Sequence, residues 1–160
     1  MDLQQGLRQG MRCLASGVCI VTGLGSEGER CAMTASSVTS VSGEPPSLLV
    51  CINKSATMDA ILESSEHLCV NVLAAAQQDV SEVCATADLG DERFSVGEWE
   101  VDQTSGLSYL LNTPAVFLCK KQKVVSYGTH SIYIADICEV LLANEKQKAL
   151  VYADGGYHHV

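Results

Sequence analysis

Basic residues are scarce in this sequence, which holds 10 Lys and Arg against 19 Asp and Glu and has a formal net charge of -9. Proteins that bind nucleic acids neutralise backbone phosphates with clustered Lys and Arg side chains, and an acidic surface opposes that contact. We therefore expect no nucleic-acid partner.

Long apolar runs are also absent. A membrane-spanning helix needs roughly 18 consecutive apolar residues, and no run in this chain approaches that length. The first residues, MDLQQGLRQGMRCLASG, lack the continuous apolar stretch of a secretory signal. We predict no membrane association and a cytoplasmic location.

Paired cysteines are missing as well, although the chain contains 8 Cys. No two of them form a CxxC pair, the spacing that zinc sites commonly use. Cys51, Cys69 and Cys119 lie inside apolar runs, where a thiol packs as a small hydrophobic group. The cysteines are therefore expected to be reduced and mostly buried, as in cytosolic proteins, and no metal site is predicted.

The chain shows no internal repeat and no linker, so its 160 residues are expected to form a single domain, 1–160. Strands are predicted at 18–22, 30–42, 47–53, 67–73, 113–125, 131–142 and 149–153. Helices are predicted at 2–15, 55–64 and 77–87, with Ser55 as a candidate N-cap of the second. Residues 88–108 are the least regular part. This pattern favours a mainly β fold, a closed β-barrel with two or three flanking helices.

Residues 23–28, GLGSEG, match the GxGxxG pattern of dinucleotide-binding folds directly after a strand. That pattern binds a pyrophosphate only when a helix follows and presents its N-terminus. Here Glu29 and Arg30 lead into another strand-like run. The glycine-rich segment is therefore interpreted as the loop of a β-hairpin.

Small and hydroxyl-bearing residues dominate the stretch from Cys31 to Ser42, CAMTASSVTSVS. A strand built only for packing favours Val, Ile and aromatic residues. Small side chains let a flat ligand approach the backbone, and the hydroxyls can donate hydrogen bonds to it. Lys54, after the next apolar run, could meet a phosphate group as a point charge.

These segments resemble the short-chain flavin reductase family, whose members are FMN-binding split-barrel proteins that supply reduced flavin to two-component monooxygenases. The resemblance covers nearly the whole chain and rests on blocks in the same order. They are GVCIVTG (17–23), AMTASSVTSVS (32–42), PPSLLVCINKSATM (45–58), LCVNVL (68–73), ERF (92–94), YGTHSIYIADI (127–137) and LVYADGGYH (150–158). Ala32 stands where the family usually has Gly. The resemblance implies a Greek-key split β-barrel of the FMN-binding type.

The family motifs also imply which residues form the site. The residues implied to contact the flavin are Thr34, Ala35, Ser36, Ser37, Ser40, Cys51, Ile52, Asn53, Lys54, Ser55 and Phe94. Those implied to contact the nicotinamide dinucleotide are Gly128, Thr129, His130, Tyr152 and Tyr157. Hydride passes between the two cofactors, so no side chain is expected to act as a catalytic acid or base.

By this resemblance, the expected activity is NAD(P)H-dependent reduction of FMN or FAD, followed by release of reduced flavin to a separate oxygenase. A homodimer is implied in the same way. The sequence leaves open FMN against FAD and NADH against NADPH. Three alternatives also stay open: a non-catalytic flavin-binding protein, another split-barrel flavoenzyme such as a corrinoid reductase, and a barrel that holds some other apolar ligand.

Overall fold

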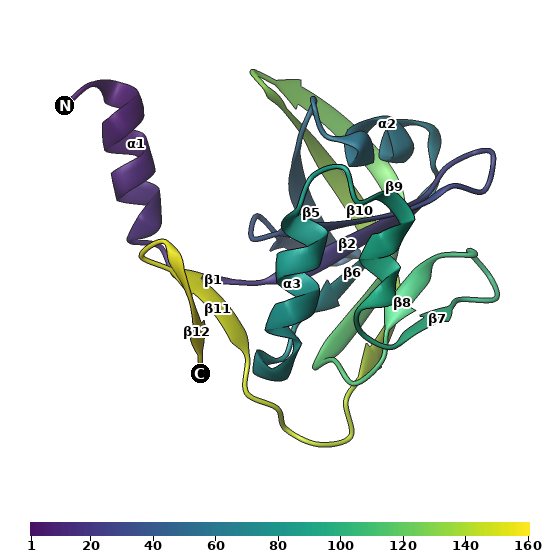
Figure 1. Cartoon of the computed structure of the whole chain (residues 1–160). Coiled ribbons are helices and arrows are strands. Elements are labelled where there is room, and N and C mark those ends of the chain that lie inside the picture. Colours follow the sequence, from purple (N-terminus) through teal and green to yellow (C-terminus); the bar gives the residue numbers. More distant parts are fainter.

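A computed structural model describes all residues, 1–160, and shows a large antiparallel sheet with a few helices around it (Figure 1). The sheet has seven strands in the order β3-β2-β6-β9-β10-β5-β4. Their bounds are β2 (Cys19–Leu24), β3 (Arg30–Ala35), β4 (Thr39–Gly43), β5 (Pro46–Asn53), β6 (His67–Val72), β9 (Ala115–Tyr127) and β10 (His130–Leu142). The mainly β fold predicted from the sequence is confirmed.

Two small sheets flank the large one. The first joins β1 (Ser16–Gly17), β11 (Leu150–Ala153) and β12 (Gly156–His159). The second is a hairpin of β7 (Trp99–Val101), which lies in the segment 88–108 predicted to be irregular, and β8 (Ser108–Leu110), which begins at the end of that segment. Its strands are three residues each, too short to leave a clear alternation in the sequence.

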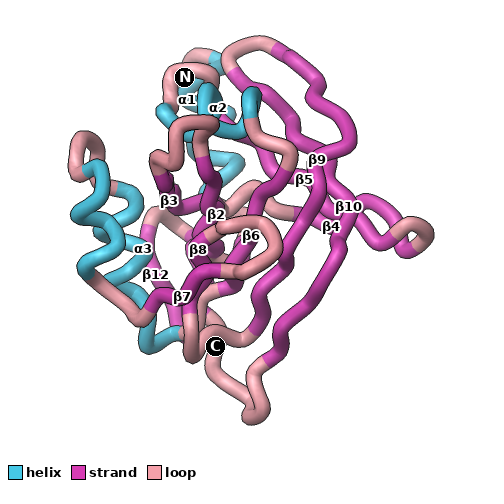
Figure 2. The backbone as a smooth tube through the Cα atoms, turned by 90° about the vertical axis from the view of Figure 1, so that its right-hand side faces the viewer, coloured by secondary structure: helices cyan, strands magenta, loops and turns pink.

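Three α-helices and two 3₁₀ turns complete the chain. They are α1 (Leu3–Arg12), α2 (Thr57–Ser64), η1 (Ala75–Gln77), α3 (Gln78–Ala85) and η2 (Gly90–Ser95). The tube view shows α2 and α3 lying beside the sheet, while α1 stands apart from it in the ribbon view (Figures 1 and 2). None of these helices has the length and apolarity needed to cross a membrane.

The core lies inside the curled large sheet and under α2. Alternate residues of β5 and β10 point inward, among them Val50, Ile52 and Tyr133, each with no exposed surface. The Tyr133 hydroxyl donates to Asp59 Oδ1 at 2.7 Å and so fixes α2 on the sheet. Burial and this carboxylate raise the pKa of Tyr133 well above its ordinary value.

The segment predicted as one strand over 30–42 is two strands with a break at 36–38, and this prediction was wrong. β3 pairs with β2 at one edge of the sheet, whereas β4 pairs with β5 at the other. The two edge strands, β3 and β4, do not pair, so hydrogen bonds do not close the barrel. The small residues at 36–38 allow the chain to cross from one edge to the other.

Residues 23–28 form the predicted hairpin between β2 and β3. Gly25 N–H donates to the Glu29 carbonyl at 2.8 Å, and Gly28 has a φ of +86°, which glycine adopts without strain. Gly23 is needed for a different reason. A Cβ at this position would lie 2.9 Å from Ile61 Cγ2, so glycine lets α2 pack directly on the strand.

Candidate functional site

Two loops meet at one end of β5 and β10. Lys54 N–H donates to the Thr129 carbonyl at 2.9 Å, and Lys54 Nζ donates to the Gly128 carbonyl at 2.9 Å. The strand register places His130 opposite Asn53, so the loops follow directly from the pairing of β5 with β10. The structure therefore brings together the Asn53–Lys54 segment and the Gly-Thr-His turn.

Ser37 connects two further segments predicted to contact the flavin, the end of β3 and the end of β5. Its Oγ donates to the Cys51 carbonyl at 3.0 Å and accepts from the Cys51 N–H at 3.2 Å. The end of β3 and the end of β5 thus lie side by side, although these strands do not pair. A serine serves here because one hydroxyl can both donate and accept.

A hollow of about 390 Å³ lies between α2, α3 and the end of β3. A second hollow, of about 250 Å³, shares Thr34 and Ala85 with it and continues toward β11 and β12. We call the two together the Thr34 trough. The first is lined by Met33, Thr34, Ser55, Ala56, Thr57, Met58, Cys84, Ala85, Ala87, Asp88 and Arg93. The second is lined by Val18, Thr34, Ser36, Ala85, Tyr152 and Tyr157.

A chain of hydrogen bonds runs along the floor of the trough. Thr34 Oγ1 donates to the Ser81 carbonyl at 2.6 Å, and Ser81 Oγ lies 2.7 Å from Tyr157 Oη. Tyr157 in turn packs edge-on against Tyr152, with ring centroids 5.4 Å apart. These contacts hold the two tyrosines of the C-terminal hairpin beside Thr34.

The predicted helix cap is not present. Ser55 Oγ donates to Asn53 Oδ1 at 2.9 Å. Helix α2 begins at Thr57, with Ala56 and not Ser55 at the cap position, and it has no side-chain cap bond. The Asn53 side-chain oxygen accepts hydrogen bonds from both the N–H and the hydroxyl of Ser55, as Asn side chains commonly do in turns. The first N–H groups of α2, from Thr57 and Met58, therefore lie uncapped at the edge of the hollow.

Arg93 is the one Lys or Arg residue that lines the trough, and sequence reasoning did not single it out. Its Nη1 and Nη2 donate to the carbonyls of Ala32 and Thr86 at 2.6 and 2.7 Å. Its Nε is buried and has no partner. The signal in the sequence was its place in the ERF block beside Phe94. Ser81, buried on α3, and Ala85, exposed one turn later, carried no comparable signal.

Several predicted residues do not line the trough. Ile52 and Phe94 have buried side chains, and Phe94 packs edge-on against Trp99 with Arg30 stacked 4.1 Å above its ring. Ser40 is exposed on the edge strand β4. The Gly-Thr-His turn lines neither hollow, and His130 is exposed, with its Nδ1 2.9 Å from Thr129 Oγ1. The residues predicted to contact the dinucleotide thus fall into two places, the turn and the tyrosine pair.

The trough contains no activated nucleophile. Burial raises the pKa of Cys84, the one cysteine that lines the trough, to about 11. This thiol therefore stays protonated at neutral pH, and a thiol is a poor nucleophile compared with its thiolate. The site can place ligands against one another, but its own side chains supply no covalent chemistry.

Comparison with known proteins gives consistent matches over the full chain. A family model described as flavin reductase like domain matches residues 11–160. The FMN reductase (NADH) RutF of Enterobacter cloacae is 36% identical over 155 residues, 97% of this chain and 93% of the relative. The protein of the same name from Pseudomonas syringae is 39% identical over 158 residues, 98% of this chain and 86% of the relative.

Solved structures show the same similarity in three dimensions. The NADH:FAD oxidoreductase SgcE6 of Streptomyces globisporus, in complex with NAD and FAD fragments, superposes with a TM-score of 0.90 at 26% identity. The match covers 98% of this chain and 92% of that one. BorF, the flavin reductase component of a bacterial two-component tryptophan halogenase, gives a TM-score of 0.89 at 31% identity and covers 98% of both chains.

Proposed function

Because the chain belongs to the flavin reductase like domain family and is therefore a flavin reductase, we propose that it oxidises NADH, reduces flavin in the Thr34 trough and releases the product to a separate oxygenase. The observation that carries this proposal is the trough itself. The trough runs from the uncapped start of α2 to Tyr152 and Tyr157, and small or hydroxyl-bearing residues line it between these ends.

The flavin phosphate belongs at the α2 end of the trough. Thr57 and Met58 line the hollow and their N–H groups have no side-chain cap, and the dipole of α2 favours an anion at its N-terminus. Arg93, which lines the same hollow, contributes a positive charge. Lys54 lies at the adjoining loop and can exchange its bond with the Gly128 carbonyl for one with a phosphate oxygen.

The flavin ring belongs beside Thr34, where the two hollows meet. Ala85 is small and Thr34 is only half-buried, so the walls leave room for a flat ring and present backbone groups to its edge. Met33 and Val18 give apolar contact at the two ends. Ring systems of this kind bind in mostly apolar clefts with a few placed polar groups.

The tyrosine pair and the Gly-Thr-His turn are assigned to the dinucleotide. Tyr152 is exposed and Tyr157 is held by Ser81, so this end of the trough presents aromatic surface to a nicotinamide ring. His130 reaches the dinucleotide from the turn, whose three residues are exposed.

Bound flavin and NADH supply the hydride acceptor and donor, and the chain supplies placement. Hydride transfer requires the two reacting atoms to lie at roughly 3–3.5 Å and aligned. The uncapped helix would hold one end of the flavin and Thr34 would meet the edge of its ring, so that the ring would face the tyrosine pair. No proton passes to a side chain in this scheme, in agreement with the protonated thiol of Cys84.

The test measures oxidation of NADH and of NADPH with FMN, FAD and riboflavin in parallel, on the wild type and on His130→Ala. We expect NADH oxidation that depends on added flavin. In His130→Ala the KM for NADH should rise about tenfold or more, the loss of one good polar contact, while the flavin dissociation constant stays within about twofold. The matched control is His159→Ala, an exposed histidine of the tail that bonds to Gln78.

Two results would contradict the proposal. Absence of flavin-dependent NADH oxidation would favour a non-catalytic flavin-binding protein. Loss of flavin affinity in His130→Ala, with the KM for NADH unchanged, would show that the turn belongs to the flavin instead. Release to an oxygenase is tested separately, by supplying a flavin-dependent oxygenase across a dialysis membrane and measuring its product.

A further inference from the structure

The hydroxyl of Tyr133 binds a carboxylate near the start of α2. Tyr133 has no exposed surface, and its Oη lies 2.7 Å from Asp59 Oδ1, to which it donates, and 3.0 Å from the Asp59 carbonyl oxygen. The hydroxyl keeps its proton at neutral pH, because burial and this carboxylate both raise the pKa of Tyr133. A hydrogen bond to a charged acceptor is roughly twice as strong as a neutral one, so this contact holds the Asp59 side chain in place.

Asp59 is the acidic residue in the first turn of α2. With Ala56 at the cap position, Asp59 is the third residue of the helix. A carboxylate at this position is attracted to the unpaired N–H groups and the positive dipole end of its own helix. If the Asp59 side chain were free, it would compete with the flavin phosphate for those N–H groups and would repel it.

The structure keeps this carboxylate out of the trough. Residues 55–58 line the first hollow, whereas Asp59, the next residue, does not. No side chain caps the start of α2, so its first N–H groups stay open to a ligand. Arg93 also lines the hollow, and its buried Nε has no partner. Asp88, an exposed loop residue, is the one acidic residue that lines it.

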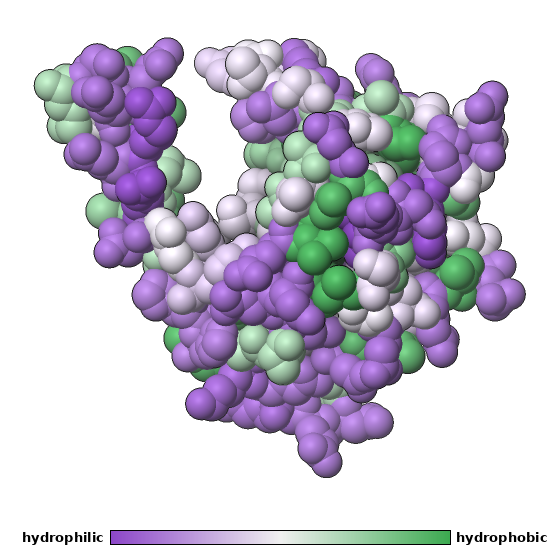
Figure 3. Space-filling view, viewed as in Figure 1, coloured by the Kyte–Doolittle hydropathy of each residue, from purple (hydrophilic) through white to green (hydrophobic).

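The acidity of the whole protein makes the position of each carboxylate near this site important. The chain holds 19 Asp and Glu against 10 Lys and Arg, and hydrophilic residues cover most of the face seen in Figure 3. Two like charges about 4 Å apart in bulk water weaken binding about fivefold. An anionic ligand therefore needs a site from which nearby carboxylates are held away.

We propose that Tyr133 is a positioning residue for the flavin phosphate, because its hydroxyl holds the Asp59 carboxylate against the core and leaves the start of α2 free for the anion. The inference rests on the proposed function, which places the phosphate at this helix start. Tyr133 lines neither hollow, so it acts through Asp59 and touches no ligand. A phenylalanine would fill the same space in the core but would leave the carboxylate unbound.

Fluorescence titration with FMN, and with riboflavin, which has no phosphate, measures the effect. In Tyr133→Phe the FMN dissociation constant should rise about fivefold or more, while the riboflavin constant stays within about twofold. In Tyr133→Phe/Asp59→Asn the FMN constant should return to within about twofold of wild type, because the released side chain is then neutral. A purely structural role predicts instead that the double variant binds FMN no better than Tyr133→Phe.

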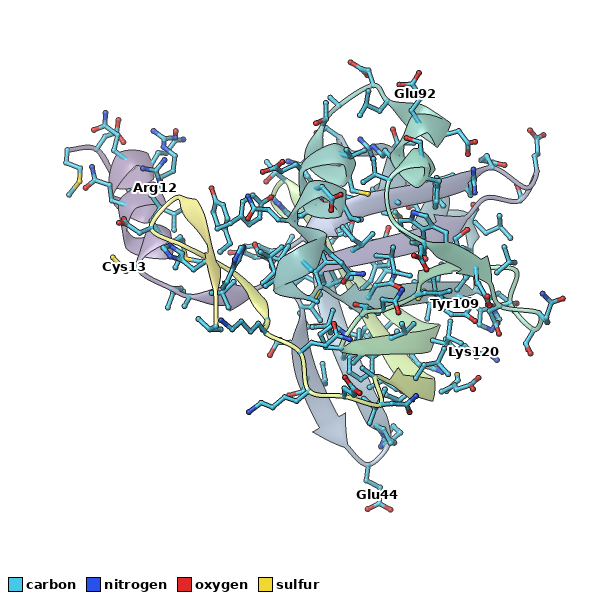
Figure 4. The ribbon with its side chains drawn as sticks, turned by 60° about the horizontal axis from the view of Figure 1, so that its bottom comes forward. Arg12, Cys13, Glu44, Glu92, Tyr109 and Lys120 are labelled. Carbon is cyan, nitrogen blue, oxygen red and sulfur yellow. The ribbon has the colours of Figure 1, made fainter.

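The matched control is Tyr109→Phe. The Tyr109 hydroxyl also donates to a carboxylate, Glu100 Oε2, at 3.1 Å. Tyr109 lines neither hollow of the trough, and it lies apart from Glu92, the neighbour of Arg93, in Figure 4. This variant should leave the FMN and riboflavin constants within about twofold of wild type.

A second pair of variants tests the inference without altering the core. Thr57 is the exposed first residue of α2 and lines the hollow. Thr57→Asp places an unheld carboxylate at the helix start, so its FMN constant should be about fivefold higher than that of Thr57→Asn, with riboflavin constants within about twofold of each other.

The outcomes separate this inference from the proposed function. A wild type that binds FMN no tighter than riboflavin would show that the phosphate does not lie at the helix start, and both would fail. A wild type that prefers FMN, with an unchanged FMN constant in Tyr133→Phe, would overturn the inference alone. So would a loss that is equal for riboflavin, or one that Asp59→Asn does not restore. Should Tyr133→Phe not fold, equal FMN constants in Thr57→Asp and Thr57→Asn would overturn it.

Discussion

Arg93 connects parts of the chain that are far apart in sequence. One guanidinium nitrogen donates to the carbonyl of Ala32 on β3 and another to the carbonyl of Thr86 after α3. The planar guanidinium suits this role because its donors diverge in a fixed geometry. Its Nε, buried and unpartnered, is the polar atom of this region that still lacks a hydrogen bond.

Replacement of Arg93 by a neutral side chain tests whether its positive charge contributes to binding of the flavin phosphate. In Arg93→Gln we expect the FMN dissociation constant to rise about tenfold or more, because the phosphate loses a nearby cation. Riboflavin has no phosphate, so its affinity should change much less. Fluorescence titration with both ligands makes the measurement, with Lys146→Gln, on an exposed loop, as the control. Equal losses for FMN and riboflavin would mean that Arg93 shapes the wall and does not meet the phosphate.

For single residues, the sequence predicted which ones lie near the site better than it predicted which of them line it. Thr34, Ser36, Ser55, Tyr152 and Tyr157 all line the trough. Motifs could not show that Ile52 and Phe94 point into the core, because the direction of a side chain depends on the strand register and on packing from distant elements. Arg93 was missed for a similar reason. Its partners are backbone carbonyls, which every residue has, so no residue type in the sequence indicates them.

Among the elements, the edge strands decide how the large sheet curls. β3 and β4 lie at opposite edges and do not pair, so Ser37 provides the contact that ties the end of β3 to β5. Loss of that contact should loosen the wall of the trough that Thr34 belongs to.

Ser37→Ala tests this contact. The variant leaves both the N–H and the carbonyl of Cys51 without this partner, and we expect it to lower the free energy of unfolding by about 1–2 kcal/mol. Ser40→Ala, on the exposed strand β4, should change it by less than about 0.5 kcal/mol. Urea titration compares the two variants with wild type. Equal effects would show that Ser37 does not hold the edges together.

Elements with strong periodicity were predicted well. HLCVNVL gives β6, the two long strands β9 and β10 lie within two residues of the predicted ranges at their starts and ends, and the helices at 55–64 and 77–87 are α2 and α3. The failures have physical causes. Whether 30–42 is one strand or two depends on which edge each half pairs with, and the short β7–β8 hairpin is stabilised by packing of Trp99 and Leu110 in a distant core cluster.

The molecule as a whole is an acidic protein with thiols in its core. Burial raises the pKa of Cys19 to about 11 and that of Cys69 to about 12, against an ordinary value of 9.0. In the unfolded chain these thiols ionise near the ordinary value, so the folded state binds more protons above it. Their contribution to stability is complete below pH 9 and is lost as the pH rises toward the folded-state values.

We therefore expect alkaline destabilisation. Each of these two buried thiols should reduce the free energy of unfolding by about 1.4 kcal/mol at pH 10 relative to its value well below pH 9. Urea midpoints at pH 8 and pH 10, measured under reducing conditions, test this. In Cys69→Ala the drop between the two pH values should be smaller than in wild type. A midpoint that does not change between pH 8 and 10 would refute the expectation.

The double contact of Lys54 with the turn at 128–130 has a consequence for how the two substrates affect each other. When Lys54 turns toward an anion, the Gly128 carbonyl loses its partner and the turn is freed to rearrange. Binding at one loop then changes the free energy of binding at the other, and thermodynamic linkage requires the effect to be equal in both directions. Occupancy by either ligand thus changes the affinity for the other by the same factor, whichever of the two binds first.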